Sequence, residues 1–214
     1  MIDFIPAKIL PGRARAGESV YLGRGDGFIL RALARIGIRT IFAMPDPANA
    51  SLIFAARRLR RREGADAPRL RILEPACDGA FETIRFSFES EEPPVVWLSG
   101  GPAALSVLPA VRVAQRSRVP LLLVSPSPDA SSGTSQTTPG LPGHRRLIRH
   151  ADLFQPFCKT QLRIEGWSEV QAIFAEAREL ARSETAGPIH IEIDAKLLSR
   201  WTARRLRNPE ELKI

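Results

Sequence analysis

Residues 70–80 have the sequence Leu70-Arg71-Ile72-Leu73-Glu74-Pro75-Ala76-Cys77-Asp78-Gly79-Ala80. A short apolar run is followed by a carboxylate, and then by a proline and small residues that open a predicted helix. In an open parallel α/β sheet, ligands bind just beyond the carboxyl ends of the strands. Glu74 stands at such a strand end, so we expect it to act as an acid/base group.

The composition is that of an ordinary globular domain, with 44% hydrophobic and 25% charged residues among 214. No window approaches the roughly 18 uninterrupted apolar residues that a membrane helix needs. Residues 1–10 lack the basic start and cleavage pattern of a signal peptide. Cys77 and Cys158 make no disulfide framework and lack metal-ligand spacing. We therefore expect a cytoplasmic protein with no membrane segment.

The net charge is +8, and arginine supplies nearly all of it. Arginines are densest in residues 57–62, a run that has no interleaved aromatic residues and no RNA-binding or recognition-helix pattern. Nucleic acid is therefore not an expected partner. Two interpretations of the run remain, namely a solvated helix end and a docking surface for an acidic partner.

Short apolar runs alternate with segments of helical periodicity along most of the chain. Strands are predicted at residues 40–43, 70–73, 95–98, 119–124 and 189–193, with another inside 154–160. Helices are predicted at residues 25–37, 48–62, 76–88 and 168–182, from residue 102 to about 115, and within 144–150.

This alternation predicts an α/β fold class: a three-layer αβα, doubly wound domain with a mainly parallel sheet. Extended arms are expected at the two ends, over residues 1–23 and 199–214. Right-handed crossovers place the carboxyl ends of all strands along one edge. Three loops then meet there, at Pro45-Asp46-Pro47, Glu74-Pro75 and Ser99-Gly100-Gly101-Pro102. Together they predict a ligand cleft.

The order and spacing of several motifs resemble those of one enzyme family. The motifs are Gly25-Asp26-Gly27-Phe28, Met44-Pro45-Asp46-Pro47-Ala48-Asn49, Glu74, Ser99-Gly100-Gly101-Pro102-Ala103, Arg118-Val119-Pro120-Leu121-Leu122, Phe157-Cys158-Lys159 and Gly187-Pro188-Ile189-His190-Ile191-Glu192-Ile193. The succession is similar to the N-terminal, pyrimidine-binding (PYR) domain of thiamine-diphosphate-dependent enzymes of the acetolactate synthase and 2-oxo-acid decarboxylase family. The resemblance assigns residues 24–198 to this domain.

The resemblance implies roles for particular residues. Glu74 would hydrogen-bond a pyrimidine nitrogen of thiamine diphosphate and promote loss of the proton from the thiazolium carbon, which attacks the 2-oxo acid. The pyrimidine side of the site would be lined by Pro45, Asp46, Gly101, Pro102 and Ser106. Gln136, His144 and Arg145, in or beside a long Ser/Thr/Pro/Gly-rich segment, would contact the anionic substrate. Glu82 remains a second candidate for the glutamate, although a helix-face position suits it better.

A complete enzyme of this family also has a diphosphate-binding domain, whose Gly-Asp-Gly motif and later asparagine hold Mg²⁺. Gly25-Asp26-Gly27 and Asn49 imitate that motif at short spacing. The triplet is expected to open a helix with no strand before it, so no metal site is expected in this chain. The resemblance implies that Mg²⁺ is held by a separate diphosphate-binding subunit, in an α2β2 heterotetramer.

Two functions in different classes remain open. One is a lyase or transferase subunit that decarboxylates or carboligates 2-oxo acids with its partner. The other is a catalytically degenerate PYR-like domain that serves as a structural or regulatory partner. It is favoured by the residues around Glu74, where the family often has His-Glu-Gln-Gly-Ala but Leu73 precedes the glutamate and Pro75-Ala76 follow it here. A nicotinamide dehydrogenase is disfavoured, because no Gly-x-Gly-x-x-Gly motif follows the first strand.

Overall fold

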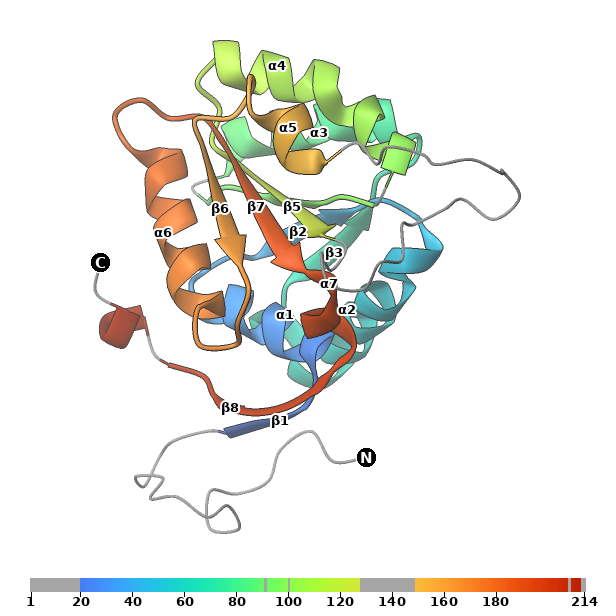
Figure 1. Cartoon of the computed structure of the whole chain (residues 1–214), viewed down its shortest axis with the longest axis vertical. Helices are drawn as coiled ribbons and strands as arrows, with labels where there is room; N and C mark the ends of the chain where they lie inside the picture. The colour runs from blue at the N-terminus through green and yellow to red at the C-terminus, as the bar shows by residue number, and fades with distance from the viewer. Residues whose placement is uncertain (1–19, 91, 100, 128–148, 208, 213–214) are drawn as a thin grey trace.

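A six-stranded parallel sheet forms the centre of the computed structural model, which describes residues 20–90, 92–99, 101–127, 149–207 and 209–212 (Figure 1). The strand order is β3 (Arg69–Ile72), β2 (Thr40–Ala43), β4 (Val95–Trp97), β5 (Leu121–Ser127), β7 (Pro188–Asp194), β6 (Thr160–Ile164). Every neighbouring pair in this sheet is parallel. The predicted fold class is therefore confirmed.

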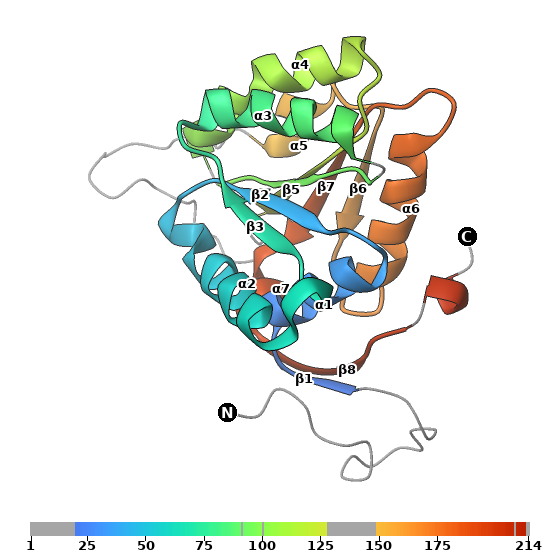
Figure 2. The same cartoon turned by 180° about the vertical axis from the view of Figure 1, so that it is seen from behind.

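Helices cover both faces of the sheet, as the two opposite views show (Figures 1 and 2). One layer contains α1 (Gly25–Arg35), α2 (Ala50–Glu63), α6 (Val170–Arg182) and α7 (Ala195–Ser199). The other layer contains α3 (Ala76–Glu89), α4 (Leu108–Arg116) and α5 (His150–Phe154). Short 3-10 turns are η2 (Pro47–Asn49), η3 (Gly64–Asp66), η4 (Gly101–Val107) and η5 (Pro209–Leu212). Within the described residues, no helix combines the length and apolarity needed to cross a bilayer.

Two apolar cores lie on opposite faces of the sheet because side chains alternate along each strand. Val95 and Trp97 of β4 pack into the core beneath α1, α2 and α6. Val96, between them, packs into the core beneath α3 and α4. All three side chains are buried. Burial on both faces explains why the central strands are continuous apolar runs rather than alternating ones.

Most of the predicted elements are confirmed to within a few residues, but two differences are informative. The prediction of a strand inside residues 154–160 was wrong, because α5 ends at Phe154 and β6 begins at Thr160. The apolar residues Phe154 and Phe157 pack under the α3–α4 layer instead of pairing in the sheet. The expected helix in residues 144–150 lies mostly outside the described residues, and α5 begins at His150.

The expected terminal arms contain a second sheet. Strand β1 (Val20–Arg24) pairs antiparallel with β8 (Trp201–Arg205), so the predicted boundary at residue 23 falls inside a strand. Tyr21 is fully buried, with its ring centroid 5.8 Å from that of Phe28 and its hydroxyl donating to Arg24 O at 2.7 Å. The two strands are separated by about 180 residues of sequence. Their pairing could therefore not be predicted from the local sequence of either strand.

A polar pair lies inside the sheet, between β5 and β7. Ser125 Oγ and His190 Nε2 are 2.8 Å apart, and both side chains are completely buried. The His190 ring also packs against Phe154, with 5.2 Å between the ring centroids. Burial, and secondarily the charge of nearby His150, lowers the pKa of His190 from its ordinary value of 6.5 to about 4. His190 therefore has a structural role inside the sheet.

Stability should depend on the protonation of His190. The unfolded chain takes up this proton below pH 6.5 and the native chain below about pH 4, so stability is lost as the pH falls between these values. The size of the shift corresponds to about 3 kcal/mol. We expect wild-type protein to lose about that much more unfolding free energy than His190→Gln between pH 7 and pH 4, measured by urea titration. Parallel pH profiles for the two proteins would contradict this assignment.

Candidate functional site

The candidate site is built on hydrogen bonds that extend the parallel ladder one residue beyond three strands. Leu73 N donates to Ala43 O at 2.9 Å, and Met44 N donates to Trp97 O at 3.1 Å. Pairing in register then places the next residues, Glu74, Pro45 and Ser99, beside one another at the carboxyl edge. With strands about 4.8 Å apart, the three strand ends span about 10 Å.

This edge is also where the strand order reverses direction. From β2 the chain moves outward to β3, and it then crosses to β4 on the opposite side of β2. Loops that leave neighbouring strands toward opposite faces open a crevice at such a switch point, and ligands in open α/β sheets bind there. In this sheet the switch point lies between the loop after β2 and the loop after β4.

Glu74 lies between β3 and α3, and its side chain is exposed. Its carboxylate has no hydrogen-bond or ion-pair partner among the residues that the structure describes. Helix α3 begins two residues after it, and Gly79 N donates to Pro75 O at 2.9 Å in its first turn. A Cβ on Gly79 would lie 2.9 Å from Leu73 Cα, so only glycine lets α3 approach the end of β3 this closely. The packing of α3 on β3 therefore fixes where the carboxylate stands.

Glu82, the second candidate glutamate, lies in the middle of α3 and is exposed. Its carboxylate accepts a hydrogen bond from Arg71 at 3.0 Å, and Arg85 lies 3.9 Å away. Arg71 in turn stacks over the rings of Phe42 and Phe86. Glu82 is thus part of a helix-face ion-pair network, whereas Glu74 stands at the sheet edge.

The loop after β2 is held by a buried amide. Asn49 Nδ2 donates to Met44 O at 3.1 Å and to Leu98 O at 3.4 Å, which ties the ends of β2 and β4 together. The Asn49 side chain is buried, and its Oδ1 has no hydrogen-bond partner among the described residues. Pro45 is exposed and Asp46 is half-buried; Asp46 O accepts from Asn49 N at 2.9 Å. Asn49 belongs to the motif of residues 44–49, but this bridging role was not predicted from the sequence.

The loop after β4 contributes Ser99 and the start of η4. Ser99 is completely buried, and its hydroxyl lies 3.7 Å from Met44 Sδ. Gly101 and Pro102 begin η4, and Ser106 lies half-buried in the same element. The predicted lining residues thus come from the two loops that flank the switch point. Gln136, His144 and Arg145, predicted to contact substrate, lie outside the described residues.

The Gly25-Asp26-Gly27 triplet opens α1, as expected, but the absence of a preceding strand was wrong, because β1 ends at Arg24. β1 belongs to the two-stranded sheet and not to the central one. Asp26 is buried, accepts a hydrogen bond from Gly27 N at 2.7 Å and lies 3.5 Å from Arg24 Nε. Its carboxylate is therefore engaged locally. In the described part of the chain, no three His, Cys, Asp or Glu side chains are grouped as a metal site.

The two cysteines are free thiols in different surroundings. Cys77 is half-buried in the first turn of α3, three residues after Glu74. Burial raises the pKa of Cys158 to about 12, so this thiol stays protonated at neutral pH and is a poor nucleophile.

Comparison with known proteins does not extend these observations. No protein-family model matches this chain, and no curated protein matches its sequence.

The Asn49 bridge should contribute measurably to stability. Asn49→Ala removes both side-chain hydrogen bonds, so the ends of β2 and β4 are held together less well. We expect a loss of about 1–3 kcal/mol of unfolding free energy, measured by urea titration. Asn49→Asp should lose at least as much, because it sets a carboxylate oxygen against the carbonyls of Met44 and Leu98. Arg57 is exposed on α2, the helix that begins directly after Asn49, and Arg57→Ala should stay within about 0.5 kcal/mol of wild type. Equal stability of all three variants would contradict the bridging role.

Proposed function

We propose that this chain is the pyrimidine-binding subunit of a two-component thiamine-diphosphate-dependent enzyme that acts on 2-oxo acids in the cytoplasm. The observation that carries the proposal is the position of Glu74. It is a carboxylate with no partner among the described residues, just beyond a strand end and beside the switch point of a parallel sheet. This is the position in which the family resemblance requires its glutamate.

The residues around the switch point fit the pyrimidine end of the cofactor. A carboxylate that can accept a hydrogen bond or hold a proton stands at one side, in Glu74. Asn49 Oδ1 is a buried acceptor without a described partner, and its amide lies between the ends of β2 and β4. Pro45, Asp46, Gly101, Pro102 and Ser106 come from the loops after these two strands and would bind the ring. When bound, thiamine diphosphate supplies an electron sink for bonds next to a carbonyl carbon.

A partner subunit is part of the proposal because Glu74 faces solvent in this chain. Chemistry of this kind benefits from exclusion of water, which here requires a second surface. Helix α3 begins two residues after Glu74, and its side chain Phe81, 41% exposed, lies in the second turn. A partner that covers Glu74 would also cover this apolar side chain. The partner would hold the diphosphate and Mg²⁺, in an α2β2 assembly.

The substrate in this proposal is a small 2-oxo acid. Gln136, His144 and Arg145 would contact its anionic end, and the reaction is decarboxylation, carboligation, or both. The enzyme would then be a lyase or transferase similar to acetolactate synthases.

A second candidate function is a catalytically degenerate domain that serves as a structural or regulatory partner. It is favoured by the loop after β2, where Asp46 and the exposed Pro47 replace two glycines of the family motif. Glycine allows a backbone to approach a ligand closely, and proline does not donate a backbone hydrogen bond.

Substitution of Glu74 tests the catalytic proposal. The chain is co-expressed with a candidate subunit that carries the diphosphate-binding motif, and 2-oxo-acid decarboxylation is assayed with thiamine diphosphate and Mg²⁺. Glu74→Gln removes a proton-transfer group but keeps its size, so we expect turnover to fall by about two orders of magnitude or more.

Glu82→Gln is the matched control, since it makes the same chemical change eight residues further along, at an exposed ion pair. Its activity should remain within about twofold of wild type. Turnover that is indifferent to Glu74→Gln would contradict the assigned role. A stable complex that turns over no 2-oxo acid would favour the degenerate domain.

A further inference from the structure

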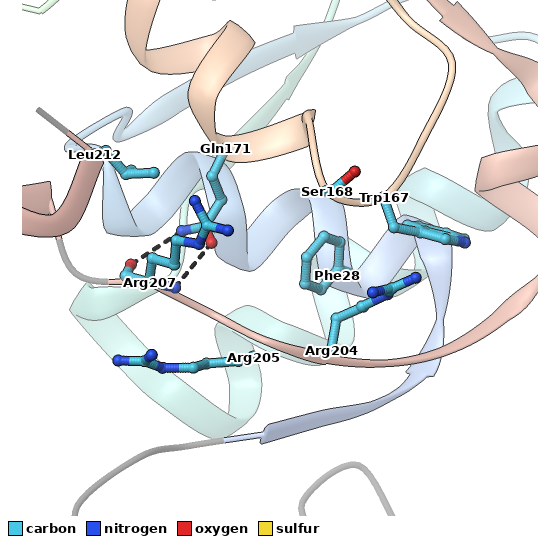
Figure 3. Close-up of a pocket in the computed structure, with 8 residues that line it drawn as sticks. All are labelled: Phe28, Trp167, Ser168, Gln171, Arg204, Arg205, Arg207 and Leu212. Atoms are coloured by element: carbon cyan, nitrogen blue, oxygen red, sulfur yellow. Dashed lines mark hydrogen bonds between the residues drawn. The ribbon is translucent and has the colours of Figure 1, made fainter. Parts of the chain in front are cut away.

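A cavity lies between α1, the start of α6 and the segment that contains β8. Its volume is about 210 Å³, and Figure 3 shows the side chains that line it: Phe28, Trp167, Ser168, Gln171, Arg204, Arg205, Arg207 and Leu212. They come from α1, the start of α6, β8 and the segment after it. The residues that open α6 follow β6, and Glu74 follows β3; these two strands are the opposite edges of the six-stranded sheet.

Arginines dominate the charge of the side chains that are described around this cavity. Among the residues that the structure describes, three arginines line it and no carboxylate does. Arg205 pairs with Glu211, at 2.8 Å. The guanidinium groups of Arg204 and Arg207 have no hydrogen-bond or ion-pair partner among the described residues. The cavity also adjoins the first turn of α6, whose positive dipole end favours an anion.

The wall of the cavity is fixed in place before any ligand binds. Gln171, which is buried, accepts from Arg207 N at 2.8 Å and donates to Arg207 O at 3.0 Å (Figure 3). This two-way bond holds the segment after β8 against α6. Trp167 meets Phe28 edge-to-face, with ring centroids 5.7 Å apart. A Cβ on Gly25 would lie 2.3 Å from the Trp167 ring, so a glycine is required where the ring packs on α1.

We propose that this cavity binds a small phosphorylated metabolite. Arg204 and Arg207 would bind the phosphoryl oxygens, because a guanidinium presents a planar set of donors that matches phosphate geometry. The organic part would lie against Trp167, toward which Arg204 points in Figure 3. The volume is below the roughly 300–1,000 Å³ of sites for drug-sized ligands, so one or two phosphoryl groups and a short organic part fill it.

Calorimetric titration of the full chain with inorganic pyrophosphate, at constant ionic strength, tests the proposal. Wild-type protein should bind one equivalent saturably. Arg204→Gln and Arg207→Gln should each weaken binding by about tenfold, the scale of one lost charged hydrogen bond. Arg204→Lys should recover only part of the affinity, because it keeps the charge but loses the planar fork.

Arg116→Gln is the control. Arg116 is exposed at the end of α4, in the opposite helix layer, and its substitution removes the same charge as the other two. Its affinity should stay within about twofold of wild type. Equal weakening by all three glutamine variants would indicate diffuse surface charge and overturn the proposal, as would no saturable binding by wild type. Because the titration needs no cofactor, substrate or partner subunit, its outcome is independent of the function proposed for Glu74.

Discussion

Parallel pairing of β2 with both β3 and β4 is the constraint on which the candidate site depends. Because all three strands point the same way, Leu73 bonds to the end of β2 and Met44 bonds to the end of β4. Residues that lie about 25 to 30 positions apart in the chain are thereby aligned at one edge. Antiparallel pairing would have sent Glu74 to the opposite edge from Pro45 or Ser99. The Asn49 bridge reinforces the alignment where the backbone ladder ends.

Burial of the sheet on both faces restricts where chemistry can occur. The central strands are enclosed by two apolar cores, and the polar pair Ser125 and His190 is sealed inside with a neutral imidazole at physiological pH. A residue in that position is isolated from any ligand. Reactive and ligand-binding groups must therefore come from loops and helix ends at the edge of the sheet, which is where both Glu74 and the arginine-lined cavity lie.

The two ends of the described chain contribute structure rather than trailing away from the domain. β1 and β8 form a short antiparallel pair beneath α1, and this pair brings Tyr21 into the core. The same closure carries Arg204 and Arg207 to α6, because the segment after β8 is fixed by Gln171. A basic segment without a sequence pattern thus becomes one wall of a defined cavity.

The sequence by itself determined the alternation of strands and helices, the fold class and the position of Glu74 between a strand and a helix. These properties are local: apolar runs of four residues, helical periodicity and a proline after the carboxylate specify them without long-range information. Only the tertiary structure decided that Tyr21 is a core residue, that Asn49 joins two strand ends and that Arg204, Arg207 and Trp167 share a cavity. Each depends on contacts between segments whose separation in sequence leaves no periodic signal, and chain closure and side-chain packing alone bring those segments together.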